Sequence, residues 1–309
     1  MKVIDLKNPH KEYPIVDCGL VLGNFDGVHR GHRALIDELK KLNKTRTPRL
    51  PLGAFCFTKH PSHIFGKPVP QLCDNEKKME LFRRAGLQFI ILCEFEELKD
   101  LSPEEFVAKT LIRDCKCQMA VCGFNYTFGK KAAGTADDLV NWLGSQPGRE
   151  VRVVPSVTDG RHVISSSVIR KMLEDGHPED ATRLLGRPYS LSGKVAKGKQ
   201  VGRKLSAPTA NLLFPADRLV PAHGVYAVTV KTGRRTYLGI SNVGHRPTFD
   251  DGNAITCETY LFDFNGDLYR KKIEVSFLYF LRGERTFDSE EALSTQIQKD
   301  IERAQKYFT

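Results

Sequence analysis

No uncharged apolar run in this 309-residue sequence is long enough to cross a membrane, and residues 1–7 carry no apolar segment of the signal-peptide type. CxxC pairs are also missing: the closest of the eight cysteines, Cys115, Cys117 and Cys122, lack zinc-type spacing. These absences argue against a membrane partner and against a zinc site. We predict buried free thiols in a cytoplasmic protein, because disulfides are rare in a reducing compartment.

Long basic blocks are missing as well, although positive charge is in excess. Lys and Arg number 47 against 37 Asp and Glu, which gives a net charge of +10, and the longest basic block is Arg270-Lys271-Lys272. A dispersed excess suits an enzyme that handles several phosphorylated small molecules. We therefore predict no nucleic-acid partner, and keep a nucleic-acid binding protein as an alternative class.

The most informative segment that is present spans residues 23–32, with the sequence GNFDGVHRGH. It follows the apolar run 18–22 and precedes residues 33–39, which have helical periodicity. We predict a strand, a glycine-containing turn and the first turn of a helix. Unpaired N–H groups at a helix start favour anions, and His29 and His32 fall on one side of that start. The segment therefore predicts a polyphosphate site.

Residues 1–185 alternate strand-like and helix-like segments. Strands are predicted at residues 19–22, 52–57, 89–93, 119–122 and 151–154. Helix starts are marked by Asp74, by the capping box 102–105 and by Thr135 with Asp138. We predict an α/β domain with a Rossmann-like parallel sheet and helices on both faces.

Residues 186–309 show short strand-like runs in succession instead. Strands are predicted at residues 189–196, 225–231, 236–243, 256–264 and 271–280. Asn265-Gly266 predicts a hairpin between the last two, and a final helix is predicted from Asp288. The apolar stripe of that helix, expected to serve packing, consists of Leu293, Ile297, Ile301 and Phe308. We predict a small antiparallel β-barrel with a terminal helix, joined to the first domain within residues 177–188.

Hydroxyls and a guanidinium precede a helix near the end of the first half. Ser165, Ser166 and Arg170 lie in ISSSVIR, where they can cap the helix and bind phosphate. A serine-rich helix start with a surface arginine is the alternative. The presence of the segment 23–32 in the same half of the chain favours the phosphate-binding interpretation.

Two strand ends of the first half carry further candidates. The loop GFNYTFGKK follows the strand 119–122, and ligands of open α/β sheets bind at the carboxyl ends of strands. There Asn125 can bond ribose or base, and Phe128 can support a ring; an aromatic loop packed under the sheet is the alternative. His60 follows the strand 52–57, where a strand ended by Pro61 explains it equally well.

The second half contains a basic loop and a pair of oxygen-bearing side chains. Residues 193–200 fit GxxxxGK, but Gln200 replaces the Ser or Thr that a P-loop needs, so we reject a P-loop. The glycine-bearing basic loop downstream can fold over phosphates. Thr209 and Asn211 share one face of an extended chain, although PTAN alone fits an ordinary turn.

Glu258 lies within a strand-like run whose other residues are mostly apolar or aromatic. A carboxylate there needs a partner or a function. It can accept a proton from a substrate hydroxyl, as a base does in kinases that lack a P-loop. A solvent-facing strand glutamate is the alternative that the residue alone leaves open.

These motifs occur in the order found in one family. GNFDGVHRGH, CFTKHP, GFNYTFGKKAAGT and ISSSVIR resemble the adenylyltransferase half of bifunctional riboflavin kinase/FMN adenylyltransferases, the prokaryotic FAD synthetases. GRKLSAPTAN, GVYAV, YLGISNVGHRPTF, ETYLFDFNGDLY and FLRGERTFDS resemble riboflavin kinase. The resemblance implies that residues 186–309 phosphorylate riboflavin with ATP, giving FMN and ADP. Residues 1–185 would then transfer AMP from a second ATP to FMN, giving FAD and pyrophosphate.

The resemblance also implies roles for individual residues, with Mg²⁺ as the metal. The adenylyltransferase site for ATP would comprise Gly23, Phe25, Asp26, His29, His32, Asn125, Ser165, Ser166 and Arg170. The kinase site would use Gly198, Gly202, Arg203 and Lys204 for ATP, Thr209 and Asn211 for magnesium, and Glu258 as catalytic base. The candidate flavin contacts are Phe57, His60, Phe128 and Arg282.

The sequence departs from the family pattern at a few places. Asn125 stands where many relatives carry Asp, Ser206-Ala207 where glycine and an aromatic are common, and Arg270 where glycine is common. The first departure bears on the role of Asn125 itself, and the others on loop flexibility and affinity. An adenylyltransferase for another acceptor, fused to a barrel, is the remaining enzyme alternative.

Overall fold

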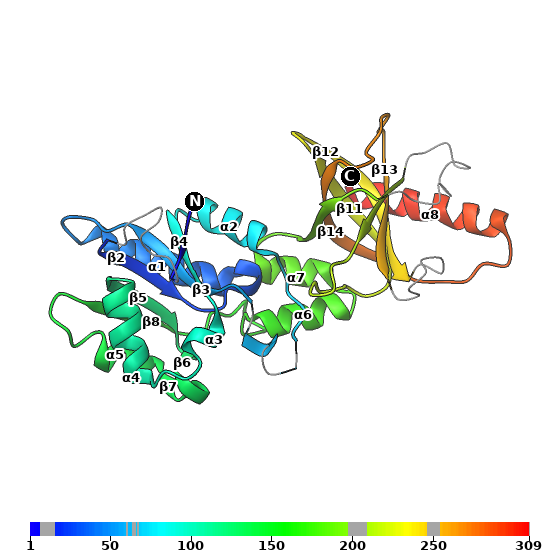
Figure 1. Ribbon diagram of the computed structural model, residues 1–309. Coiled ribbons are helices and arrows are strands. Elements are labelled where there is room, and N and C mark those ends of the chain that lie inside the picture. Colours follow the sequence, from blue (N-terminus) through cyan, green and yellow to red (C-terminus); the bar gives the residue numbers. More distant parts are fainter. Residues whose placement is uncertain are drawn as a thin grey trace. The chain divides into compact units, whose positions relative to one another are not determined.

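The computed structural model describes residues 1–6, 16–59, 61–63, 66, 68–196, 209–245 and 254–308. Contacts between residues group the chain into two compact units, Met1–Ser165 and Ser166–Thr309. Each unit has its own six-stranded sheet and its own helices (Figure 1).

The first unit is built on a parallel sheet. Its strands lie in the order β1 (Lys2–Asp5), β4 (Phe89–Cys93), β3 (Leu52–Phe57), β2 (Cys18–Leu22), β5 (Cys117–Gly123) and β8 (Glu150–Val154). All neighbouring pairs are parallel. Parallel sheets are covered on both faces, and accordingly all five residues of β2 are buried. The predicted Rossmann-like sheet is confirmed, and β1 is an additional strand that the sequence pattern did not mark.

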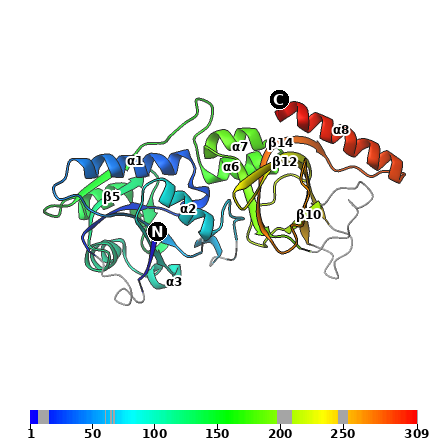
Figure 2. The ribbon, with the colours of Figure 1, turned by 90° about the horizontal axis from the view of Figure 1, so that it is seen from above.

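Helices cover both faces of this sheet. On one face lie α1 (Arg30–Lys44), which runs along the sheet in Figure 2, and α2 (Asn75–Arg84); they pack with Val21 of β2. On the other face, η3 (Phe106–Asp114) and α5 (Ala136–Trp142) pack with Leu20 and Leu22. Successive side chains of a strand point to opposite faces, so β2 contributes to both core clusters.

The three predicted helix starts in this unit are confirmed. The Asp74 carboxylate accepts a hydrogen bond of 2.6 Å from the backbone N–H of Lys77. Reciprocal capping boxes begin α4 (Pro103–Glu105) and α5. The remaining short elements are η1 (Asp26–Val28), η2 (Pro61–His63), α3 (Phe95–Leu98), β6 (Thr127–Phe128), η4 (Lys130–Ala132) and β7 (Gly134–Thr135).

The second unit begins with α6 (Ser166–Glu174) and α7 (Pro178–Leu185) and continues into an antiparallel sheet. Its strands lie in the order β10 (Thr209–Leu213), β13 (Ile255–Leu261), β12 (Arg235–His245), β11 (Gly224–Thr232), β14 (Lys272–Gly283) and β9 (Tyr189–Lys194). A bridge between Ala196 and Asn211 joins the chain after β9 to β10, and Figure 2 shows the strands as a ring. The predicted small barrel is confirmed.

The terminal helix α8 (Glu290–Phe308) packs on the outside of the barrel. Ile297, Ile301 and Phe308 lie against a buried cluster that includes Val225 and Ile240. The prediction that this apolar stripe serves packing is therefore confirmed for these three residues.

One prediction about the barrel strands was wrong. Asn265-Gly266 does not form a hairpin between β13 and β14, because β13 pairs with β10 and β12 while β14 pairs with β11 and β9. The extended chain predicted for Thr209 and Asn211 is confirmed, because β10 begins at Thr209 and buries Ala210 and Leu212. The alternative of an ordinary turn is thereby excluded.

The division between the units differs from the predicted junction within residues 177–188. Helices α6 and α7 pack on each other, and α7 packs on β14 and β9, so both helices group with the barrel. Helix α7 ends at Gly186, whose φ of 73° is a left-handed C-cap. The assignment of separate activities to residues 1–185 and 186–309 stays a prediction.

Candidate functional site

The strand order of the first unit indicates where a ligand is expected at the carboxyl edge of the sheet. After β2 the chain proceeds to β3 and β4 on one side, whereas β5 and β8 lie on the other side of β2. Ligands of open α/β sheets bind where the strand order reverses in this way. The turn from β2 to α1 and the loop after β5 therefore flank the expected binding crevice.

The turn from β2 to α1 has an unusual backbone. Phe25 and Val28, which are not glycines, have φ angles of 51° and 42°, and Gly27 has a φ of 78°. Left-handed conformations cost energy for a bulky or β-branched residue and persist only where the surrounding structure imposes them. Here Phe25 is fully buried, with its ring edge-on to Phe82 of α2 at 5.2 Å. Packing thus holds the turn in a strained shape, as is common at functional sites.

His29 and His32 form a stacked pair at the start of α1. Their ring centroids are 3.6 Å apart with an interplanar angle of 17°. His29 is the N-cap residue, and its Nδ1 accepts a hydrogen bond of 3.3 Å from the backbone N–H of His32. Because Nδ1 accepts, the proton of a neutral His29 lies on Nε2, which can donate to a phosphate oxygen. The predicted placement of both imidazoles on one side of the helix start is confirmed.

Gly31 allows a second segment to approach this helix start. A Cβ at this position would lie 3.1 Å from the His29 ring and 3.3 Å from the carbonyl oxygen of Ile164. Ile164 directly precedes Ser165, so the end of the first unit reaches the first turn of α1. Ser166 and Arg170 lie on α6 in the second unit. Their action together with the histidines stays a prediction.

Two buried charged side chains support the turn from beneath. Asp26 is 5% exposed, and its carboxylate accepts a hydrogen bond of 2.9 Å from the backbone N–H of Leu72. Lys78 of α2 is 6% exposed, and its Nζ donates a hydrogen bond of 3.3 Å to the backbone carbonyl of Asn24. The sequence interpretation missed Lys78. Its spacing from Leu81 and Phe82 (i, i+3, i+4) was the available signal, because it places the lysine on the buried face of the helix.

The other candidates of the first unit lie at strand ends. Asn125 is exposed in the loop after β5, next to the β2 turn in strand order. Phe57 is half-buried at the end of β3, edge-on to Phe95 at 5.2 Å. Phe128 is 6% exposed and packs against Tyr126 and Phe106, which favours the packed aromatic loop over support of a ligand ring. His60 lies outside the described residues.

In the second unit, three polar side chains form a row across neighbouring strands. Asn211 of β10 is the register partner of Glu258 of β13, which is the register partner of Asn242 of β12. Directly opposed residues of antiparallel strands point to the same face, with Cβ atoms about 5 Å apart. Thr209 lies on this face too, two residues before Asn211. We define these four residues as the polar row.

The polar row combines buried and exposed side chains, as a binding site for a metal ion would. Asn211 is 4% exposed, and its Oδ1 has no hydrogen-bond partner in the part of the chain that the structure describes. Glu258 is half-buried, and Thr209 and Asn242 are exposed. Leaving a buried amide oxygen unbonded is costly, and such oxygens are the ligands that Mg²⁺ prefers. The donor set therefore fits magnesium. Sequence reasoning missed Asn242, because strand register was needed to find it.

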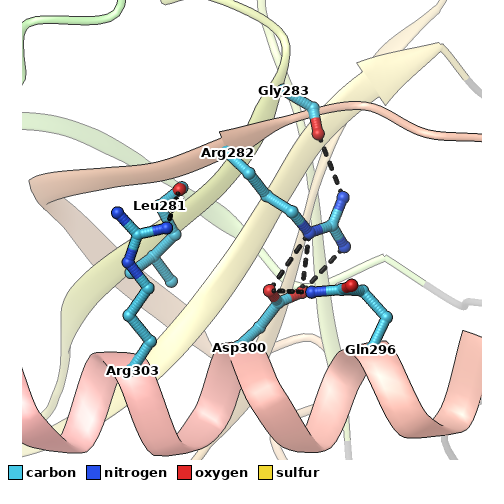
Figure 3. A network of polar contacts seen from close by, with 6 residues as sticks. All are labelled: Leu281, Arg282, Gly283, Gln296, Asp300 and Arg303. Carbon is cyan, nitrogen blue, oxygen red and sulfur yellow. Dashed lines mark hydrogen bonds and ion pairs between the residues drawn. The ribbon is translucent and has the colours of Figure 1, made fainter.

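Arg282 lies near the polar row but is engaged elsewhere. It pairs in register with Val225, which pairs with Asn242. Figure 3 shows its guanidinium bonded to Asp300 of α8, with Nη2 to Oδ2 at 2.7 Å. Gln296 donates to the same carboxylate at 2.9 Å, and Arg282 Nη1 donates to the carbonyl of Gly283. These contacts fasten α8 to β14, and a flavin contact by Arg282 stays a prediction.

We expect Asp300→Asn to lower the free energy of unfolding of the barrel by about 3 kcal/mol. The side chains of Arg282 and Asp300 are 12% and 5% exposed, so the variant leaves a nearly buried guanidinium without its carboxylate. Urea titration measures this loss, with the hydrogen exchange of α8 and β14 amides as the readout. Asp180→Asn breaks an exposed pair with Arg183 and should cost less than about 1 kcal/mol. Equal losses in the two variants would contradict this assignment.

The kinase candidates Gly198, Gly202, Arg203 and Lys204 lie outside the described residues. So do Ser206 and Ala207. Among the residues that are described, no group of three or more His, Cys, Asp or Glu side chains is arranged to hold a metal ion. The fit to magnesium thus rests on the neutral oxygens of Thr209 and Asn211.

All eight cysteines are free and buried, as predicted. Burial raises the pKa of the Cys122 thiol to about 12, and burial likewise raises the pKa of Cys117 to about 12. Thiols that stay protonated at neutral pH are poor nucleophiles and poor metal ligands. Within the described ranges, no helix is both long enough and apolar enough to span a bilayer.

Comparison with known families matches both halves of the chain. Residues 14–168 match the FAD synthetase family and residues 185–308 match the riboflavin kinase family. The bifunctional riboflavin kinase/FMN adenylyltransferase of Listeria monocytogenes is 34% identical, with 100% of this chain and 98% of the relative covered. That of Bacillus subtilis is also 34% identical (100% and 99%), and that of Escherichia coli is 32% identical (100% and 98%).

A solved structure supports the fold over the whole length. The crystal structure of a macrolide-efflux protein from Streptococcus pneumoniae has a TM-score of 0.87 and 32% identity, and 99% of each chain is covered. The efflux name belongs to the Streptococcus protein alone. For this chain the match concerns the fold, and the function follows from the two family matches.

Fold and sites together define a two-domain nucleotide-using transferase, with a nucleotidyltransferase sheet and a kinase barrel. The chain belongs to the bifunctional riboflavin kinase/FMN adenylyltransferase family. It is an ATP-using enzyme that makes FMN from riboflavin and FAD from FMN.

Proposed function

We propose that adenylyl transfer takes place at the turn between β2 and α1, and that riboflavin phosphorylation takes place at the polar row of the barrel. The observation that carries the first assignment is the stacked histidine pair at the start of α1, beside the point where the strand order reverses. The second assignment rests on Glu258 and the unbonded Asn211 oxygen as register partners.

In adenylyl transfer, a phosphate oxygen of FMN attacks the α-phosphorus of ATP. The bond from that phosphorus to the bridging oxygen breaks, and pyrophosphate leaves. Positioning and charge stabilisation dominate such a reaction. His29 and His32 would donate hydrogen bonds to the phosphates, aided by the N–H groups at the start of α1. Asn125, Ser165, Ser166 and Arg170 would complete the binding of ATP.

The turn itself would shape the ATP site. Gly23 would let the backbone approach the nucleotide, whereas Phe25 and Asp26 would act by fixing the turn from within, since both are buried. This is a role in positioning rather than in contact. It follows from the edge-on packing of Phe25 and from the bond that Asp26 accepts from Leu72.

In phosphorylation, Glu258 would accept the proton of the riboflavin 5′-hydroxyl as its oxygen attacks the γ-phosphorus of ATP, and ADP would leave. Thr209 and Asn211 would hold Mg²⁺, which neutralises charge on the ATP phosphates when bound. Asn211 and Glu258 are cross-strand partners, so the hydroxyl and the phosphates would be held side by side. Gly198, Gly202, Arg203 and Lys204 would cover the phosphates, and Phe57, His60 and Arg282 remain the candidate flavin contacts.

We expect Asn211→Ala to raise the Mg²⁺ concentration needed for half-maximal FMN formation at least about tenfold. The change removes an oxygen that the buried site offers to the metal. A magnesium titration of FMN formation measures this, with FAD formation from FMN as the internal reference. Leu213→Ala, at an exposed position two residues along β10, is the control and should leave the titration unchanged. An unaltered magnesium requirement in Asn211→Ala would remove Asn211 from the metal site.

A time course from riboflavin, ATP and Mg²⁺ tests the proposed function. We expect FMN to form first and FAD to follow, both separated by chromatography. Formation of neither product would contradict the proposal and would favour an adenylyltransferase with another acceptor.

A further inference from the structure

Lys78 is a buried cation beside the candidate ATP site. Lysine is almost never fully buried unless it is paired, yet Lys78 is 6% exposed. Its Nζ donates to the carbonyl oxygen of Asn24, which lies between β2 and the histidine pair. In the part of the chain that the structure describes, no carboxylate forms an ion pair with Lys78. An ammonium group has three N–H donors, and this bond uses one of them.

The packing of α2 holds this ammonium in place. Leu81 and Phe82 share the buried face of the helix with Lys78, and Phe82 packs against Phe25 of the turn. The charge also reaches the sheet: burial raises the pKa of Cys56 in β3 to about 12, and the positive charge of Lys78 opposes this shift. Lys78 is therefore bonded to the turn, and its charge also acts on Cys56 of the neighbouring strand β3.

A buried charge without a counter-ion is strongly unfavourable. An anion supplied by a ligand can compensate such a group. A candidate anion site lies at the start of α1, where the histidine pair and the first helical N–H groups favour phosphate. The neighbouring Lys77 differs, because its ammonium is paired with Glu80 at 3.1 Å.

We infer that Lys78 is a positioning residue for the polyphosphate of ATP in adenylyl transfer. Its bond to Asn24 holds the turn, and its charge stabilises the anion bound at the start of α1. The inference rests on the proposed function, because it assumes that ATP binds at this turn. It adds a charged group from α2, an element to which the sequence assigned no role.

The test compares ligands of increasing charge in the Lys78→Met variant. Methionine has a similar length and no charge. FAD formation from supplied FMN is followed, and the KM of ATP and the inhibition constants of AMP and adenosine against ATP are measured. We expect the KM of ATP to rise about tenfold, the AMP constant to rise less, and the adenosine constant to stay within about twofold. A role limited to shaping the turn would weaken all three ligands equally and would overturn the inference.

Stability provides a second, independent readout. Replacing an uncompensated buried charge by an apolar side chain of similar volume is often neutral or stabilising. We therefore expect the ligand-free Lys78→Met protein to melt at the same temperature as the wild type or higher, with FMN formation unchanged. A lower melting temperature together with unchanged ligand constants would assign Lys78 to folding and would overturn the inference.

Two control variants separate charge at this site from charge in general. Lys78→Arg keeps the charge and should recover most of the affinity for ATP, whereas Lys77→Met removes a paired charge one residue away and should change nothing. An equal effect of Lys77→Met would contradict the inference. If the wild type forms FAD but His29→Ala and His32→Ala do so normally, the proposed site fails instead, so the two failures are distinguishable.

Discussion

Glu258→Gln should reduce FMN formation from riboflavin by about 10²- to 10⁴-fold, while FAD formation from supplied FMN stays near the wild-type rate. Glutamine keeps the size and much of the hydrogen bonding of glutamate, but its amide does not accept a proton at neutral pH. The change alters the side chain alone, so the backbone pairing of β13 with β10 and β12 is kept. Separate assays of the two reactions, started from riboflavin and from FMN, measure the two rates.

Glu274→Gln is the matched control for this experiment. Glu274 lies on β14 of the same barrel, and its carboxylate accepts a hydrogen bond of 2.8 Å from Ser190. It does not belong to the polar row and is bonded to Ser190 of β9, so its loss should leave both reactions near their wild-type rates. Loss of both activities in a folded Glu258→Gln protein would contradict independent sites. Normal FMN formation would show that Glu258 is not the base.

Replacing His29 or His32 by Ala should reduce FAD formation by about 10²- to 10³-fold, so that FMN accumulates when riboflavin is the substrate. Under the proposed function, each change removes a donor to the phosphates on which charge develops as pyrophosphate leaves. The stacked arrangement makes the pair act as a unit, so we expect the double variant to be little worse than either single one. Chromatography of a time course from riboflavin and ATP measures both flavin products.

His29→Asn separates the two functions of His29. Asparagine is a good N-cap residue, so it preserves the start of α1 while it removes the imidazole. We expect it to be as stable as the wild type and as slow in FAD formation as His29→Ala. If His29→Asn restores normal FAD formation, the histidine acts only as a cap, and the phosphate role is wrong.

The local signals in the sequence predicted the first unit well. The strand before the turn was marked by a continuous apolar run, and the helix starts by Asp74, Ser102 and Thr135. Strand β1 was missed because it is a four-residue strand with three exposed residues, which leaves no apolar pattern. The histidine pair was found because its two members are close in sequence. Lys78 was overlooked, although its helical spacing would have placed it on the buried face of α2.

The barrel was predicted less completely, because its strands are paired by distant parts of the chain. Asn265-Gly266 is a strong local turn signal, yet β13 and β14 each pair with other strands. The polar row depends on the registers of β10, β12 and β13, and spacing in the sequence did not reveal that Asn242 lies beside Glu258. Likewise, the bond between Arg282 and Asp300 joins a strand to a helix, and only the folded chain shows it.

Under the proposed function, each half of the chain carries one reaction at its own site. Mixing the Glu258→Gln and His32→Ala proteins with riboflavin, ATP and Mg²⁺ is the sharpest test of this separation. Each variant alone should fail to make FAD from riboflavin. The mixture should make it, because the second variant supplies FMN and the first converts it. Absence of FAD from a mixture of two folded variants would contradict the account.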